Sequence, residues 1–141
     1  MIVKSYITAR YAETDQMGVV HHSVYPVWFE IGRTDFIKSL GVSYSNLEKE
    51  GIMLPLSVLT CKYHYPVHYE DNVVLETRLC KISAAKLEFK FSVNLKDSGI
   101  LAAEGCTVMG IVSAKNFHPL NLKKANPELF KKLYEAIETF N

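Results

Sequence analysis

A carboxylate and a predicted helix start lie close together near the beginning of the sequence. Asp15 stands on a turn that contains Gly18, and six residues separate it from His22, where a long amphipathic helix is expected to begin. The free N–H groups and partial positive charge at a helix N-terminus can stabilise a developing oxyanion. A carboxylate beside them can attack an electrophilic carbon or activate water, so this arrangement is a usable catalytic one.

The same residues also have ordinary structural interpretations. Asp is common in turns and helix caps, so Asp15 alone does not indicate catalysis. His22 could supply only its backbone N–H or a side-chain donor as well, and the sequence leaves both open. Glu30 precedes Arg33 by three residues on the predicted helix, which is typical of a helical ion pair.

Histidines and cysteines do not form a metal-binding pattern in this sequence. The side chains of the adjacent His21 and His22 diverge, so they do not share a ligand. Pro66 separates His64 from His68, and we interpret these two histidines as strand-end residues. We expect no metal and no cofactor. Spacings of 19 and 26 residues suggest neither a disulfide framework nor a zinc site for the three cysteines: Cys61, Cys80 and Cys106.

The helix that positions the candidate groups is predicted over residues 23–40. Pro26 falls in its first turn, where a missing N–H costs nothing, and Gly41 is a natural C-terminal stop. Gly32, inside the helix, either allows a strand or ligand to approach closely or is a tolerated defect. The expected buried stripe has spacings of mostly three and four residues: Val24, Val27, Trp28, Ile31, Phe36, Ile37 and Leu40.

A strand is predicted before this helix, over residues 2–11, and a short helix, four strands and a terminal helix after it. These later elements cover residues 43–50, 53–65, 72–82, 87–95, 100–112 and 127–140. Apolar and polar residues alternate over 87–95, and the turn at 96–99 makes the following strand antiparallel. A single long helix can cover only one sheet face, so the other is expected to be solvated or covered by a partner, which favours a dimer.

Length and composition indicate an ordinary globular protein. The 141 residues suit a single domain over 1–141, with 48% apolar and 22% charged residues. A formal net charge of +1 gives no reason to expect a nucleic-acid partner. We expect no signal peptide and no membrane span, since no apolar run approaches the roughly 18 residues required. A cytoplasmic location fits these features.

The segment around Asp15 resembles a known family. Residues 11–25 (YAETDQMGVVHHSVY), followed by Trp28, Glu30 and Arg33, are similar to hotdog-fold acyl-CoA thioesterases of the 4-hydroxybenzoyl-CoA thioesterase and YbgC-type group. The resemblance covers roughly residues 3–120. It implies an α+β hotdog fold, in which an antiparallel sheet wraps around a long central helix. It also implies a homodimer, often paired into a homotetramer, with active sites at the dimer interface.

The resemblance also implies roles for individual residues. Asp15 corresponds to the catalytic carboxylate, and His22 to the helix-start residue whose backbone N–H points at the thioester carbonyl. Gly18 corresponds to the glycine of the turn, and Tyr25 to an aromatic residue of the first helical turn. Lys86 corresponds to a strand region that contacts CoA, although that region varies in residue type.

Two further positions qualify the resemblance. Some hotdog thioesterases place a catalytic Glu on the long helix, which makes Glu30 a second candidate carboxylate. His21 departs from the family, where related sequences often carry Tyr or Phe. This difference affects the expected shape of the acyl pocket and leaves the role of Asp15 unchanged.

The function implied is hydrolysis of an acyl-CoA, or of an acyl-carrier thioester, to free acid and thiol. Asp15 would serve as nucleophile or as general base, and the sequence does not choose between them. The alternative is a non-catalytic acyl-CoA-binding protein on the same fold. A hotdog dehydratase is disfavoured, because the His-Phe-Pro-type segment of those enzymes is absent. The acyl group stays open, since the aromatic residues suit an aromatic or a short aliphatic group equally.

Overall fold

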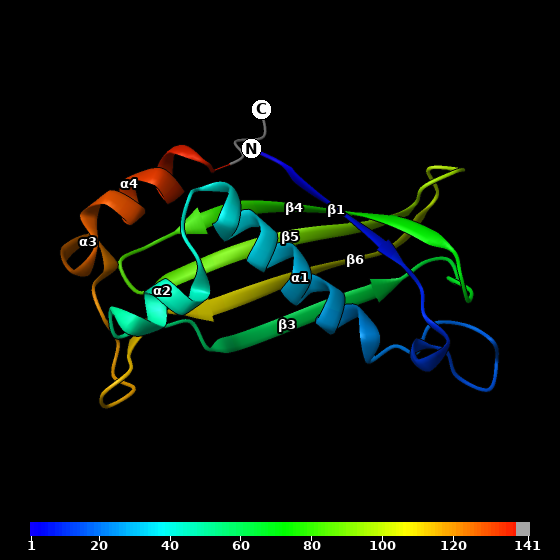
Figure 1. Ribbon diagram of the computed structural model, residues 1–141, viewed down its shortest axis with the longest axis horizontal. Coiled ribbons are helices and arrows are strands. Elements are labelled where there is room, and N and C mark those ends of the chain that lie inside the picture. Colours follow the sequence, from blue (N-terminus) through cyan, green and yellow to red (C-terminus); the bar gives the residue numbers. More distant parts are fainter. Residues whose placement is uncertain (138–141) are drawn as a thin grey trace.

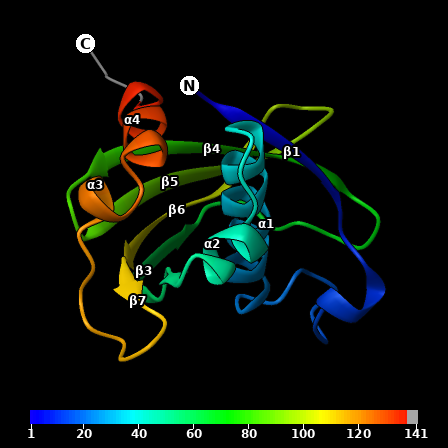
Figure 2. The ribbon, with the colours of Figure 1, turned by 60° about the vertical axis from the view of Figure 1, so that its left-hand side comes forward.

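The computed structural model describes residues 1–137 and contains one large antiparallel sheet. A long helix, α1 (Val24–Ser39), lies against one face of this sheet (Figure 1). In the order of their pairing the strands are β1 (Val3–Thr8), β4 (Asn72–Ile82), β5 (Lys86–Leu95), β6 (Leu101–Gly110) and β3 (Leu56–Tyr63). Figure 2 shows the sheet wrapping around α1, which confirms the predicted α+β arrangement.

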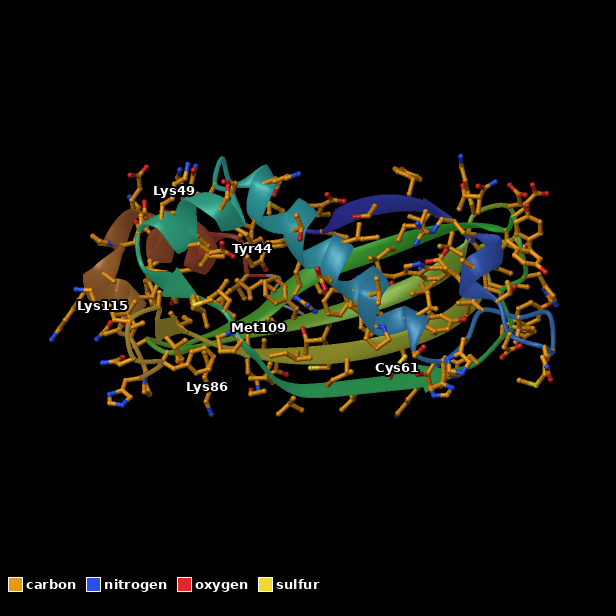
Figure 3. The ribbon with its side chains drawn as sticks, turned by 60° about the horizontal axis from the view of Figure 1, so that its bottom comes forward. Tyr44, Lys49, Cys61, Lys86, Met109 and Lys115 are labelled. Atoms are coloured by element: carbon orange, nitrogen blue, oxygen red, sulfur yellow. The ribbon has the colours of Figure 1, made fainter. Side chains whose placement is uncertain are left out.

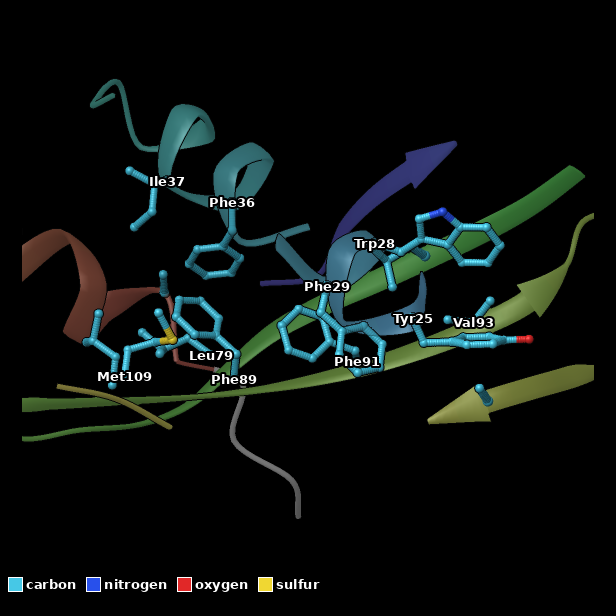
Figure 4. Close-up of a cluster of buried hydrophobic side chains, with 14 of the residues drawn as sticks. Tyr25, Trp28, Phe29, Phe36, Ile37, Leu79, Phe89, Phe91, Val93 and Met109 are labelled. Atoms are coloured by element: carbon cyan, nitrogen blue, oxygen red, sulfur yellow. The ribbon is translucent and has the colours of Figure 1, made fainter. Parts of the chain in front are cut away.

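Helix α1 begins and ends within one residue of the predicted limits, but its buried face differs from the predicted stripe. Val27 and Ile31 are exposed, at 52% and 40%, whereas Tyr25 and Phe29 are buried. The stripe prediction was therefore wrong at Val27 and Ile31. The aromatic side chains of this helix pack onto the sheet in the cluster of Figure 4, and Phe29 stacks on Phe91 with ring centroids 4.5 Å apart.

Gly32 explains how α1 approaches the sheet so closely. A Cβ added at this position would overlap Thr77 Oγ1 and lie 2.9 Å from Leu75 Cδ2, and both residues belong to β4. Of the two interpretations of Gly32, the close approach of a strand is therefore the one that the structure shows. This contact also sets the rotation of α1 about its axis, because the turn that carries Gly32 must face the sheet.

Pro55 interrupts the predicted strand 53–65 near its start. The structure has instead a short strand β2 (Ile52–Met53) and the separate strand β3, with Pro55 between them. Proline has no N–H to donate to a ladder, and the Pro55 carbonyl accepts a hydrogen bond from Gly110 N–H at 2.8 Å. Strand β2 pairs with β7 (Val112–Ser113), so the predicted strand 100–112 is divided as well.

The first strand is shorter than predicted, whereas the short helix after α1 is present as predicted. Strand β1 stops at Thr8, and a short 3-10 helix, η1 (Tyr11–Glu13), occupies the end of the predicted strand 2–11. The short helix α2 (Tyr44–Lys49) was predicted, and its N-cap Ser43 accepts a hydrogen bond from Asn46 N–H.

The terminal helix was predicted at its correct starting point. It is α4 (Pro127–Glu135), with Pro127 at its start and the Asn126 side chain as its cap. The preceding turn of helix, α3 (Leu122–Ala125), was not predicted. Phe140, the last residue expected on the terminal helix, lies outside the described residues.

The face of β5 that lies away from α1 is polar. Along β5, Leu87, Phe89, Phe91 and Val93 are buried, and the alternate positions from Glu88 to Asn94 are exposed or half-buried, as the alternation predicted. All three cysteines are free and half-buried. No helix within residues 1–137 is long and apolar enough to cross a bilayer.

Candidate active site

Asp15 lies on a tight turn that its own side chain helps to form. Its backbone N–H donates to Val19 O at 2.9 Å, and Gly18 N–H donates to Asp15 O at 3.0 Å. Gly18 has φ +78°, a conformation that glycine adopts readily. Asp15 Oδ1 accepts from Met17 N–H at 2.8 Å. Oδ2 has no hydrogen-bond partner within residues 1–137, so one carboxylate oxygen is available to substrate or water.

This turn opens onto a cleft of about 780 Å³. The cleft lies between the Asp15 turn, η1 and the start of α1, and Tyr69 closes one side of it. The lining residues are Tyr11, Ala12, Glu13, Thr14, Asp15, Gln16, Gly18, His21, Ser23, Val24 and Tyr69. The structure therefore places the candidate carboxylate and the first residues of the helix, Ser23 and Val24, on one cavity, whereas His22 is not among the lining residues.

His22 lies directly before α1 with its backbone N–H unused. The two neighbouring N–H groups are occupied: that of His21 donates to Glu13 O, and that of Ser23 donates to His21 Nδ1. The His22 N–H has no acceptor within the described residues, whereas its carbonyl accepts from Tyr63 Oη at 3.0 Å. A free donor at a helix N-terminus is suited to polarising a carbonyl oxygen.

Two contacts hold the arms of the loop together. Thr14 and Val20 form an antiparallel bridge, and the His21 N–H reaches Glu13 O at 2.9 Å. The loop of Asp15 is consequently closed at its base. Backbone hydrogen bonds at the base of this loop therefore constrain the position of the carboxylate relative to the helix start.

Glu13 is a site residue that reasoning from the sequence missed. Its carboxylate is buried and accepts hydrogen bonds from Arg10 N–H at 2.8 Å and from Trp28 Nε1 at 3.0 Å. Burial raises the pKa of this carboxyl, but hydrogen bonds from the Arg10 main chain and side chain and from Trp28 outweigh it and hold the pKa below its usual 4.5. Its place two residues before Asp15 was the signal available in the sequence.

Tyr25 supports the start of α1 from the core side. Its ring packs edge-to-face on Trp28 and on Tyr63, with centroids 5.3 and 5.2 Å apart. Burial, followed by the neighbouring Cys61 and Tyr63, raises the pKa of Tyr25 to about 12, so its hydroxyl stays protonated at neutral pH. Tyr25 is buried and does not line the cleft of Asp15 within one chain (Figure 4).

Lys86 and Glu30 are not brought to this cleft within one chain. Lys86 begins β5 at the end of the sheet away from the Asp15 turn (Figure 3), where it lines a separate cleft of about 420 Å³. Glu30 is exposed, and the predicted ion pair with Arg33 is not formed within residues 1–137. Arg33 is instead buried, with its guanidinium 6.0 Å from the ring centroid of Phe91.

The remaining candidate ligands are dispersed. His64 follows β3 and lies 3.5 Å from Glu104, and His68 pairs with Val19 in an isolated bridge. Within residues 1–137 no three His, Cys, Asp or Glu side chains are grouped so that they could hold a metal ion.

Known proteins share the sequence pattern and the fold of this chain. The family model of the thioesterase-like superfamily matches residues 9–133. The chain belongs to this superfamily. A curated relative, the putative acyl-CoA thioesterase YneP of Bacillus subtilis, is 35% identical over 127 residues, which cover 90% of this chain and 91% of YneP. This membership confirms the hotdog fold and the prediction of a thioester hydrolase.

Two further superfamily relatives extend the comparison. The crystal structure of DHNA-CoA thioesterase from Staphylococcus aureus is 34% identical and has a TM-score of 0.91, covering 95% of this chain and 89% of that one. The acyl-acyl carrier protein thioesterase ATL3 of Arabidopsis thaliana is 35% identical over 98 residues, or 68% of this chain and 52% of ATL3. The roles assigned to Asp15, Gly18, His22, Tyr25 and Lys86 stay predictions.

Proposed function

We propose that this thioester hydrolase cleaves acyl-CoA to a free acid and CoA, with Asp15 and the His22 N–H as its catalytic groups. One observation carries the proposal: a carboxylate with a free oxygen lines the same cleft as Ser23 and Val24 at the start of α1, and the N–H of the preceding residue, His22, has no acceptor within the described residues. The relatives named as acyl-CoA thioesterases support the choice of substrate.

The reaction requires two aids, because a thioester carbonyl is already electrophilic. The carbonyl oxygen accepts a hydrogen bond from the His22 N–H, which stabilises the oxyanion as the tetrahedral intermediate forms. A single donor of this kind contributes about 3 kcal/mol in other enzymes. Asp15 either attacks the carbonyl carbon, giving an anhydride that water then hydrolyses, or removes a proton from the attacking water. The thiolate of CoA leaves in both routes.

Two other substrates or roles compete with this proposal. A thioester on an acyl carrier protein is the second candidate substrate, and the relative ATL3 is the observation that favours it. A protein that only binds acyl-CoA is the non-catalytic alternative. The half-buried Asp15 carboxylate disfavours pure binding, because it adds negative charge beside an anionic ligand without any gain for recognition.

A panel of acyl-CoA thioesters tests the proposed function. Wild-type protein is expected to release CoA, detected with a thiol-reactive dye, from at least one of the short aliphatic, long aliphatic and aromatic thioesters. The same acyl groups on an acyl carrier protein test the second candidate. If calorimetry shows binding of acyl-CoA while no thioester of either kind is cleaved, the binding protein is the correct interpretation.

The assembly proposed with this function is a homodimer formed along β3. This strand ends the sheet, pairs only with β6 among the described strands, and exposes Leu56, Val58 and Leu59 at 40–48%. The strand also carries the exposed Lys62, but a long edge strand with exposed apolar side chains is a template for pairing with another chain. Tyr63, at the end of β3, donates to the His22 carbonyl, so such an interface would run beside the site.

Antiparallel pairing of β3 with its own copy would also give Lys86 a role. The two sheets would then run end for end, with the Lys86 end of one chain turned toward the Asp15 end of the other. A CoA contact from the partner chain is therefore compatible with the separation of Lys86 and Asp15 within one chain. Further pairing of such dimers into a homotetramer would use other surfaces.

Replacing the apolar edge-strand residue Leu59 with lysine is expected to dissociate the dimer. Sedimentation of wild-type protein should give two or four times the mass of one chain, and Leu59→Lys should halve that mass because its charge would be placed in the new sheet contact. Tyr134→Lys is the matched control, since Tyr134 is 64% exposed on α4, away from β3. A monomeric wild type, or an unchanged mass for Leu59→Lys, would contradict the β3 interface.

A further inference from the structure

Glu13 hydrogen-bonds to both ends of the loop that carries Asp15, at Arg10 and His21, and to Trp28 on helix α1. We propose that Glu13, with Trp28 as its partner, is a positioning residue that holds Asp15 and the His22 N–H in one geometry for thioester cleavage. This inference rests on the proposed function. Glu13 acts through its neighbours, and the step itself is performed by Asp15 and His22.

The side chain of Glu13 ties the Asp15 arm to α1. Its Oε2 accepts from Trp28 Nε1 at 3.0 Å, in a hydrogen bond that is fully buried. Its Oε1 accepts from Arg10 N–H at 2.8 Å. Trp28 is only 1% exposed and belongs to the core cluster, so its indole is a rigid anchor for the carboxylate. The segment just before Asp15 is thereby fixed to the second turn of the helix.

The backbone of Glu13 ties the same segment to the other arm. Its carbonyl accepts from the His21 N–H at 2.9 Å, one residue before the proposed donor His22. Glu13 is thus two residues from Asp15 in the chain and hydrogen-bonded to the neighbour of His22. A displacement of Glu13 would move the carboxylate and the free N–H relative to each other.

The Glu13 carboxylate is buried, so its hydrogen bonds must offset the free-energy cost of removing a charge from water. Glu13 is 7% exposed, and a buried carboxylate is destabilising unless hydrogen bonds satisfy it. Each of the two Glu13 carboxylate oxygens accepts a hydrogen bond. Glutamine could accept only one of these bonds, because its amide has one acceptor oxygen and would present N–H groups to the other donor. A buried carboxylate contributes little to the free energy of folding, because its desolvation cost offsets its hydrogen bonds. It can nevertheless fix the relative positions of the groups that donate to it.

The expected consequence is a loss of turnover without a loss of binding. Catalysis requires the reacting atoms within a narrow range, and a displacement of about 1 Å can cost roughly 100-fold in rate. Trp28 does not line the cleft, so removing its Nε1 donor leaves every lining side chain present for substrate contacts. The KM for acyl-CoA should therefore change little, while kcat falls.

Three variants of the whole protein test this role. Trp28→Phe keeps an aromatic ring and removes the Nε1 donor, and it is expected to lower kcat by about 10-fold or more with KM changed less than about 2-fold. Glu13→Ala should lower kcat further, and Glu13→Gln should recover part of that loss, since it keeps one acceptor. Amide hydrogen exchange at His21 should be faster in Trp28→Phe and Glu13→Ala.

Ile37→Ala is the matched control for general destabilisation. Ile37 is fully buried on the same helix, nine residues beyond Trp28, and contacts none of the site. It should lower stability and leave kcat unchanged. If Trp28→Phe keeps the wild-type kcat, or if Ile37→Ala lowers kcat equally, the positioning role is wrong. If wild-type protein cleaves no thioester, the proposed function itself is wrong, and exchange at His21 then reports only a structural link.

Discussion

Replacing Asp15 with Asn is expected to lower kcat for thioester hydrolysis by about 100-fold or more while leaving the fold intact. The reason is that Asn keeps the side-chain oxygen that accepts the Met17 N–H, so the turn can still form. What it loses is the negative charge and basicity of the free oxygen, which both proposed routes require. A structural role for Asp15 and a catalytic one therefore predict different results for this single change.

His22→Ala should behave in the opposite way. It removes the imidazole and keeps the backbone N–H, so activity is expected to stay within about 5-fold of wild type if the N–H is the oxyanion donor. A loss as large as that of Asp15→Asn would instead assign the His22 side chain a direct part in the reaction. This variant decides the choice that the sequence left open.

The matched control for Asp15→Asn is Asp71→Asn. Asp71 also accepts a backbone hydrogen bond, from His68 N–H at 2.8 Å, but it does not line the cleft. It should keep full activity. The two variants and wild type would be compared by steady-state kinetics on the best acyl-CoA substrate and by thermal unfolding. Full activity in a folded Asp15→Asn protein would remove Asp15 from the mechanism.

The second large effect is expected on stability, at Gly105 in the middle of β6. Gly105→Ala should lower the free energy of unfolding by about 3 kcal/mol, at the upper end of overpacking costs. The new Cβ would lie 2.5 Å from Phe29 Cε2 and 2.5 Å from the backbone oxygen of Thr60. Relief would require moving either the edge strand β3 or the aromatic stack of Phe29 on Phe91.

Gly110→Ala, in the same strand, is the matched control. Its nearest neighbour would be Pro55 Cγ at 3.7 Å, an ordinary van der Waals contact. The free energy of unfolding of Gly110→Ala should therefore lie within about 1 kcal/mol of the wild-type value, since replacing a strand Gly also lowers the entropy of the unfolded chain. Urea unfolding of the two variants measures the difference. Equal midpoints would mean that β6 and α1 are less closely packed than the contacts of Gly105 require.

Local patterns predicted the elements that carry the site. The limits of α1 follow from Pro26 in its first turn and Gly41 after its end, and both are signals within the helix itself. The alternation along β5 marks its buried face, because side chains of a strand point to opposite sides in turn. The Asp15 turn is equally local, since its hydrogen bonds span two to four residues.

Contacts between distant segments were outside the reach of such patterns. The spacing of apolar residues placed Val27 and Ile31 inside, but the close approach of Gly32 to Thr77 turns α1 so that they are exposed. The sequence predicted one strand over residues 53–65, whereas Pro55 divides β2 from β3 in the structure.

The sequence by itself determined the order of the elements, the turn that carries Asp15 and the helix start beside His22, because each depends on neighbours along the chain. Only the tertiary structure decided how the site is held. Trp28 reaches Glu13 across 15 residues and Tyr63 reaches His22 across 41, and neither pair leaves a periodic signal. Tertiary packing likewise put Lys86 at the far end of the sheet, since strand pairing sets which ends meet.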